Sequence, residues 1–227
     1  QTGTIDVQTS EGTYRFNAEE MRLIADKASG DSISLSSESV ELIKQHRIDN
    51  AKAAKPSIVS ISRKDSLVTV RWTRKDGADG YVLKLITDGR TYTEKITDVN
   101  TSEFTFSQKV TKSYRVRAAA VTDVDGQQVT SAYSCKTSVV KPTVSKISKA
   151  SKTKKVTVKW KRMSSVDGFR VRLVYKGKTT TRYISNPKAV SHTFGTKVTG
   201  SYKIKISSYS NIEGKKAYST EKTFSRK

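Results

Sequence analysis

Apolar and polar residues alternate along most of the chain after residue 55. Residues 69–72 read TVRW and lead into DGY at 79–81, and 88 positions later residues 157–160 read TVKW and lead into DGF at 167–169. Alternation with a period of two is typical of strands that are buried on one face. The sequence therefore predicts one β-module that occurs twice.

Each copy contains seven short alternating runs separated by turn signals such as Asp88-Gly89 and Asp125-Gly126. In the first copy we expect strands at 57–62, 66–74, 80–87, 91–97, 102–107, 112–122 and 129–139. In the second copy we expect them at 143–148, 155–162, 168–175, 179–185, 190–195, 200–210 and 217–225. Strands of this number and spacing predict two tandem seven-stranded antiparallel β-sandwiches.

The inward phase of these strands supplies a core to each module. Trp72 and Trp160 share that phase with the neighbouring valines, and burial of an indole ring is worth about 3 kcal/mol or more. Tyr114 and Tyr202 stand where an inward ring closes the corner of a sandwich. Each module should therefore fold around its own aromatic anchors.

The first 54 residues predict a small α/β segment. Residues 5–8 and 13–16 alternate around a glycine-bearing turn, which predicts a hairpin. Asn17 and Glu20 form a capping box, so we expect a helix from there to Gly30, followed by a strand at 32–36. Residues 40–48 predict a second short helix, and 49–55 a linker that ends at Pro56.

Both modules resemble fibronectin type III domains, in the version common in surface proteins of Firmicutes. The resemblance is carried by VRW at 70–72, DGYVL at 79–83, YRVRA at 114–118 and SAYS at 131–134, and by VKW, DGFRV, YKIKI and AYS in the second copy. Val116 and Ile204 stand where an antibody-like domain has a cysteine. The resemblance implies the fibronectin type III fold without a disulfide.

The first segment is similar to a small α/β repeat of clostridial surface proteins, through GTYRF at 12–16 and GDSISL at 30–35. We accordingly expect three units: a small α/β segment and linker at 1–54, and sandwiches at 55–140 and 141–227.

The positive charge is concentrated in the last module. Lys and Arg outnumber Asp and Glu by 22 to 3 in residues 142–227 and by 15 to 9 in 55–141, whereas residues 1–54 carry 6 against 9. The net charges are therefore +19, +6 and −3. Self-repulsion of this size makes an anionic partner worth considering.

No arrangement of residues indicates catalysis, a cofactor or a metal. His46 and His192 lie in different segments without ligand neighbours, and neither a phosphate loop nor a nucleophile motif is present. Residues 123–126 (DVDG) favour a hairpin turn over a calcium site. Cys135 is the single cysteine, which we expect to be a semi-buried or an edge-strand thiol. We predict a protein that is not an enzyme.

The outward phase of the second module yields the candidate site. Arg170 and Arg172 alternate with inward residues on one predicted strand, and Lys203 and Lys205 do so on its predicted neighbour, with Arg182, Lys176 and Lys178 on the strand beside it. Like charges on neighbouring strands are unfavourable unless something offsets them. Two interpretations remain open: a solvated face that keeps strands from pairing between molecules, and a surface that binds a polyanion. The first module has a weaker version in Lys84, Arg115 and Arg117.

The expected partner is an anionic cell-wall polymer, an acidic glycan or another surface protein. Nucleic acid is disfavoured because the outward phase reads as Arg, Lys, Val and Thr without aromatic residues for base stacking. The chain has no run of 18 apolar residues, so no membrane span is expected, and an export signal would lie outside this sequence. We expect a monomeric, extracellular, adhesive or spacing region of a bacterial surface protein; the alternative is an accessory region of a secreted polysaccharide- or peptidoglycan-acting enzyme.

Overall fold

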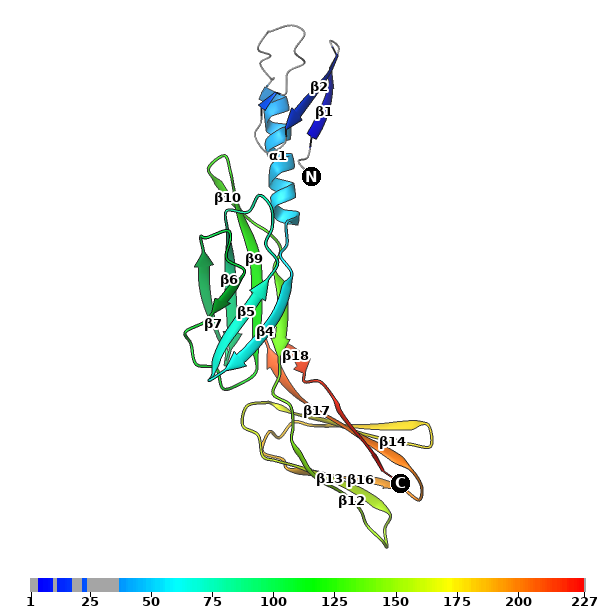
Figure 1. The fold of residues 1–227 in the computed structure, drawn as a ribbon. Helices are drawn as coiled ribbons and strands as arrows, with labels where there is room; N and C mark the ends of the chain where they lie inside the picture. The colour runs from blue at the N-terminus through cyan, green and yellow to red at the C-terminus, as the bar shows by residue number, and fades with distance from the viewer. Residues whose placement is uncertain (1–3, 10–11, 18–21, 24–36, 227) are drawn as a thin grey trace.

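The computed structural model of the protein describes residues 4–9, 12–17, 22–23 and 37–226. Helix α1 and two β-sandwiches follow one another end to end, which makes the molecule elongated (Figure 1). No helix in the described part of the chain is long and apolar enough to cross a membrane.

Three short strands precede the helix: β1 (Thr4–Thr9), β2 (Gly12–Asn17) and β3 (Arg22–Leu23). β1 and β2 form the predicted hairpin. The helix predicted from Asn17 onward is wrong at residues 22–23, because β3 pairs there with the end of β2. A capping box is a local signal of about 1 kcal/mol, which strand pairing can override. The strand predicted at 32–36 lies outside the described residues.

Helix α1 (Ser37–Ala53) confirms the helix predicted at 40–48 but continues into the segment predicted as a linker. Its last turns pack on the first sandwich, where Ile48 and Ala51 form a small buried cluster with Val124 and Val129. This burial, together with the helix-forming alanines, stabilises helix where the sequence pattern alone indicated a linker.

The first sandwich has one sheet in the order β4-β5-β8 and a second in the order β10-β9-β6-β7, with β11 also paired to β9. The strands are β4 (Ile58–Lys64), β5 (Leu67–Trp72), β6 (Gly80–Thr87), β7 (Arg90–Ile96), β8 (Glu103–Thr105), β9 (Tyr114–Val124), β10 (Gln127–Thr130) and β11 (Ser134–Ser138).

The second sandwich repeats this topology, with sheets β12-β13-β16 and β15-β14-β17-β18 and with β19 also paired to β17. The strands are β12 (Val144–Lys149), β13 (Lys155–Trp160), β14 (Gly168–Tyr175), β15 (Lys178–Ile184), β16 (Ser191–Lys197), β17 (Tyr202–Ile212), β18 (Lys215–Tyr218) and β19 (Lys222–Arg226). Both copies are therefore antiparallel β-sandwiches with the same strand order, as predicted.

The last predicted strand of each copy is divided into two strands in the structure. In the first sandwich β10 and β11 are separated around Ser131, whose hydroxyl accepts a hydrogen bond from the Ala120 amide at 2.9 Å. Ser219 does the same for the Ser208 amide at 3.1 Å in the second. A side-chain acceptor at these points replaces a ladder hydrogen bond and interrupts the strand.

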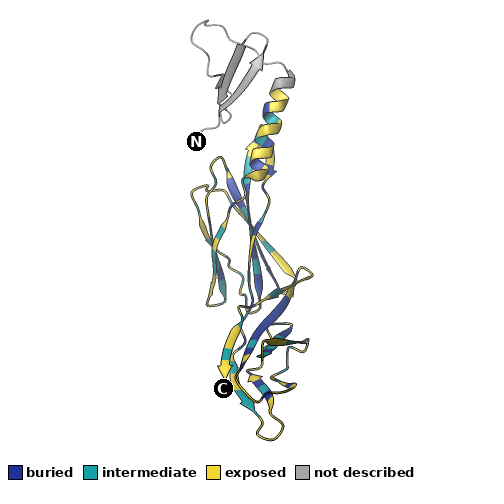
Figure 2. Ribbon diagram, turned by 90° about the vertical axis from the view of Figure 1, so that its right-hand side faces the viewer, coloured by how far each residue is buried: buried dark blue, intermediate teal, exposed yellow. Residues whose placement is uncertain are grey.

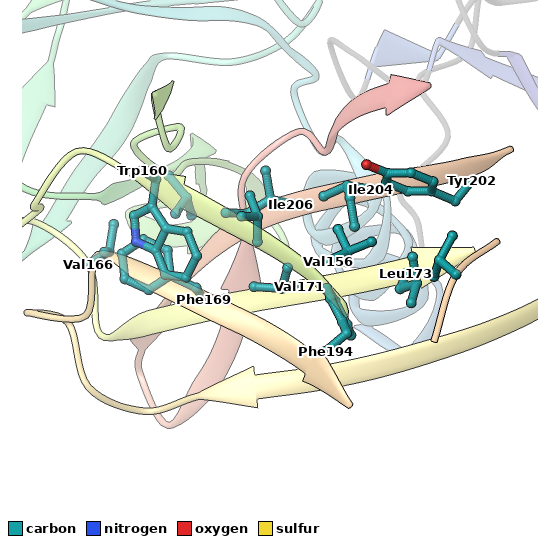
Figure 3. Packing of buried hydrophobic residues seen from close by; sticks show 13 residues of the cluster. Val156, Trp160, Val166, Phe169, Val171, Leu173, Phe194, Tyr202, Ile204 and Ile206 are labelled. Carbon is teal, nitrogen blue, oxygen red and sulfur yellow. The ribbon is translucent and has the colours of Figure 1, made fainter. Parts of the chain in front are cut away.

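The cores lie between the two sheets of each sandwich (Figure 2). Trp72 and Trp160 are each 2% exposed, as their inward phase predicts. In the second sandwich the indole of Trp160 lies beside Phe169, with their ring centroids 4.9 Å apart, and the strand residues Val171, Ile204 and Phe194 fill the space beyond (Figure 3). Each sandwich thus has its own core.

Candidate functional site

Strands β14 and β17 place the predicted cations on the outer face of the second sandwich. Phe169, Val171 and Leu173 point inward and are at most 1% exposed. The alternate residues Arg170 and Arg172 consequently point outward. The same holds for Lys203 and Lys205 on β17, which pairs with β14 so that Arg172 lies directly opposite Lys205.

Arg182 is not brought to this face. It lies on β15 opposite the inward-pointing Val171, and residues opposite each other in an antiparallel pair share a face. Lys178, on the same strand, lies opposite Tyr175 and likewise belongs to the inner side. The predicted strand neighbours are therefore correct, but these two cations project from the other side of the sheet at its edge.

Glu221 lies among the predicted cations, and the sequence pattern did not indicate it. Its carboxylate forms a two-pronged ion pair with Arg172 and lies 3.7 Å from Arg170 and 4.0 Å from the Lys205 ammonium. The Glu221 side chain is only 18% exposed. Three of the four cations therefore share one carboxylate, and Lys203 has no carboxylate partner among the described residues.

Three tyrosines also lie on the outer face: Tyr183 of β15, Tyr209 of β17 and Tyr218 of β18. The guanidinium carbon of Arg170 lies 4.3 Å from the centre of the Tyr218 ring, and the ammonium of Lys216 lies 5.0 Å from that of Tyr209. Burial raises the pKa of the Tyr218 hydroxyl. The expectation that this face lacks aromatic residues is wrong.

The alternation that marks the cations also carries a signal for two of these tyrosines. Tyr209 stands in phase with Lys203 and Lys205 within the strand predicted at 200–210, and Tyr183 lies on the strand predicted at 179–185. Tyr218 is on a strand that reaches the face only through the turn after Ile212.

The ring of Tyr209 covers Gly168, where a β-carbon would lie 2.6 Å from the tyrosine oxygen. The equivalent Gly80 has no such ring, and a β-carbon at either glycine would also clash with a carbonyl oxygen of the neighbouring strand, at 2.4 Å from Ile96 and 2.2 Å from Ile184.

In the first sandwich, the outward cations Lys84, Arg115 and Arg117 all contact other side chains. The ammonium of Lys84 lies 4.8 Å from the centre of the Tyr133 ring. Arg115 and Arg117 each donate a hydrogen bond of 2.7 Å to Glu213, which belongs to the second sandwich. These two arginines therefore link the first sandwich to the second at the joint between them.

Serine hydroxyls and a short connecting segment complete this joint. The Ser210 hydroxyl lies 2.8 Å from that of Ser113, and the Ser113 hydroxyl in turn lies 3.3 Å from the Ser165 carbonyl oxygen. Val139, which precedes the second sandwich, is 8% exposed and packs in that sandwich's core. A cleft of about 310 Å³ remains between the two sandwiches. Contacts of this kind restrict their relative orientation.

The described residues contain no group of three or more His, Cys, Asp and Glu that could hold a metal ion. The DVDG segment is a turn: Asp125 and Gly126 have positive φ angles of 54° and 81°, and the Gly126 amide donates to Asp123. Cys135 is an exposed free thiol on β11. The pKa of His192 is lowered by burial and by the nearby Arg182.

No family model matches the sequence, and no curated protein matches it. Among solved structures, a segment of two fibronectin type III domains from chicken tenascin is 21% identical, with a TM-score of 0.41 over 76% of this chain and 98% of that one. The FN1–FN3 domains of chicken CNTN1 are 14% identical, with a TM-score of 0.30 over 77% of this chain and 67% of that one.

Proposed function

We propose that the chain is a non-catalytic, extracellular binding and spacing region of a bacterial surface protein, and that the outer face of its second sandwich binds an anionic polymer. The observation that carries the proposal is the common projection of Arg170, Arg172, Lys203 and Lys205 from two paired strands. The bacterial assignment is supported by the sequence resemblance to the Firmicutes version of these domains.

The cationic surplus of the second sandwich is not neutralised internally. Its three acidic residues all have structural contacts: Asp167 accepts a 2.6 Å hydrogen bond from the Asn211 amide, Glu213 pairs across the joint, and Glu221 lies among the cations. Most of the 22 Lys and Arg residues in 142–227 consequently have no acidic partner within that module. A polyanion would relieve their mutual repulsion and release its own counterions.

The geometry favours an acidic glycan or cell-wall polymer over nucleic acid. Base stacking needs an open aromatic ring face, but cations of the protein already lie over the rings of Tyr218 and Tyr209. Tyr183 is the most exposed of the three, at 56%, and it too has the Lys216 ammonium 5.7 Å from its ring centre. Charged and hydroxyl groups, rather than bare ring faces, are thus presented to a ligand.

The test is retention of the full chain on sulfated-glycan, polyglycerol-phosphate and single-stranded-DNA resins across a salt gradient. Replacing Arg170, Arg172, Lys203 and Lys205 with glutamine should lower the eluting salt concentration strongly on the first two resins. The matched control replaces four exposed lysines on the outer face of the opposite sheet with glutamine: Lys146, Lys155, Lys159 and Lys197.

Both variants change the net charge equally, so a difference between them reports position rather than total charge. Earlier elution of the first variant alone supports the proposed face. Equal elution of both variants would show a non-specific charge effect, and tighter retention on DNA than on either other resin would reject the polymer class.

A further inference from the structure

The two joints of the molecule use the same contact. In the turn between β17 and β18, Glu213 pairs with Arg115 and Arg117 of the preceding sandwich at 2.7 Å. Asp125 lies 88 positions earlier, in the equivalent turn between β9 and β10. It pairs with Arg47 of the preceding helix at 2.8 Å. Each sandwich therefore presents a carboxylate from the same turn to an arginine in the unit before it.

The surface that contacts Glu213 lies at the end of the first sandwich that is farther from helix α1. Ile86, Thr87 and Ser113 line the cleft at the joint and are 5%, 8% and 5% exposed. Beside them, the Arg115 side chain is 13% exposed. Apolar, hydroxyl and cationic groups are thus combined in one receiving surface.

The offset of 88 repeats this receiving surface at the far end of the second sandwich. Ile86, Thr87 and Ser113 correspond to Val174, Tyr175 and Ser201. The two arginines Arg115 and Arg117 correspond to Lys203 and Lys205. The apolar, hydroxyl and cationic character is retained at four of these five positions, and Thr87 becomes a tyrosine.

In the second sandwich the repeated surface is open. Three of its five residues, Val174, Ser201 and Lys203, line a hollow of about 490 Å³ together with Lys176, Tyr202, Ser225 and Arg226. Ser201 and Lys203 are exposed, and Val174 is half-buried, whereas their counterparts in the first sandwich are covered. Among the described residues, no ion pair involves Lys176, Lys203 or Arg226.

We propose that this hollow is a socket for a further β-sandwich of the same kind, whose acidic residue in the turn equivalent to 211–214 pairs with Lys203 and Lys205. Lys176 stands where the first sandwich has Asp88, so the socket is more basic than its counterpart and favours an acidic turn more strongly. The further sandwich would bury Val174, as the joint with the second sandwich buries Ile86. Fixed joints in series produce a stiff spacer.

This inference does not depend on polymer binding. The two arginines of the proposed polymer face, Arg170 and Arg172, do not line the hollow. Lys203 belongs to both the hollow and the polymer face, and Lys205 lies on the same strand. A bound sandwich and a bound polymer would therefore compete for these two lysines.

The test appends a copy of residues 140–227 directly after Lys227. Position 227 lies 88 after position 139, so Lys227→Val keeps both the spacing of the existing joint and the valine that packs in the core of the following sandwich. A carbodiimide links an amine to a carboxylate only when the two are in contact, and mass spectrometry identifies the linked peptides. We expect Lys203 or Lys205 to be linked to Glu213 of the appended copy, and Glu213→Gln in that copy to remove the link.

The existing joint supplies the positive control, because Arg115→Lys together with Arg117→Lys should be linked to Glu213 in the unextended chain. A second extended chain carries residues 52–139 instead, with Asp125 in the turn. A link from the socket in either extended chain, at a yield within about threefold of the control, supports the inference. The inference is overturned if the control chain is linked but neither Lys203 nor Lys205 is linked in either extended chain, even when polymer binding is intact.

Discussion

The two sandwiches are nearly the same inside. Trp72 lies edge-on to Tyr81 with centroids 5.4 Å apart, and Trp160 contacts Phe169 in the same place. The amide of Asp123 donates to Asp79 at 2.6 Å, as that of Asn211 does to Asp167. In the three-stranded sheet of each sandwich, two threonine hydroxyls lie 2.8 Å apart at equivalent positions.

Their outer faces differ. Arg71 of the first sandwich forms an ion pair with Glu103 on the neighbouring strand. The equivalent pair in the second sandwich is Lys159 and Ser191, which leaves the cation without that partner. An inward residue must fit a closely packed core, whereas an outward residue meets solvent or a partner. The outer faces can therefore acquire charge without a change of fold.

The largest expected effect tests whether the two cores are equivalent. Trp160→Ala and Trp72→Ala should each lower the free energy of unfolding by about 3–5 kcal/mol, because each removes a large buried ring. Denaturant unfolding monitored by far-ultraviolet circular dichroism measures each change, and the fluorescence of the remaining tryptophan reports the sandwich that was not altered. A loss below about 1 kcal/mol in one sandwich alone would show that its core is organised differently.

Independent folding of the second sandwich is the next prediction. Residues 141–227 alone should give a cooperatively unfolding β-protein, since they contain both sheets and all the buried core residues except Val139. Adding Val139 and Val140 should raise the stability by about 1–3 kcal/mol, because Val139 is buried in that core. Circular dichroism during thermal unfolding compares the two fragments. An unfolded spectrum from both would reject the boundary predicted near Pro142.

Breaking the joint should have a smaller effect. Glu213→Gln removes the carboxylate that holds Arg115 and Arg117, and should cost about 1 kcal/mol of coupling between the sandwiches. X-ray scattering should show a wider range of inter-sandwich orientations. Glu103→Gln is the control, because it removes an exposed ion pair within one sandwich. Identical scattering from both variants would mean that Glu213 does not fix the joint.

The smallest expected effect concerns His192, which contacts Phe194 where the first sandwich pairs Phe104 with Phe106. Burial lowers the pKa of His192 below its usual value, so the unfolded chain binds the proton more readily. This group's contribution to stability is present above about pH 6.5 and declines as the pH falls below it. His192→Phe should flatten the change in thermal midpoint between pH 7 and 5.5, and an unchanged slope would contradict the prediction.

The sequence predicted the strands well because period two is a local property of the backbone. Strand β6 begins and ends where the pattern places it, and the inward residues Leu173 of β14 and Ile204 and Ile206 of β17 are buried as predicted. The errors fall where a contact from elsewhere decides the outcome. Pairing with β2 makes residues 22–23 a strand, and contact with Val124 and Val129 continues α1 to Ala53.

The candidate site divides in the same way. Alternation alone determined that Arg170, Arg172, Lys203 and Lys205 point outward, because successive side chains on a strand point to opposite faces. Only the tertiary structure placed Glu221 among them, assigned Arg182 to the other face and brought Tyr218 beside Arg170. These contacts depend on the register between strands that are distant in sequence and on the turns that join them. Neither is determined by the pattern within any one strand.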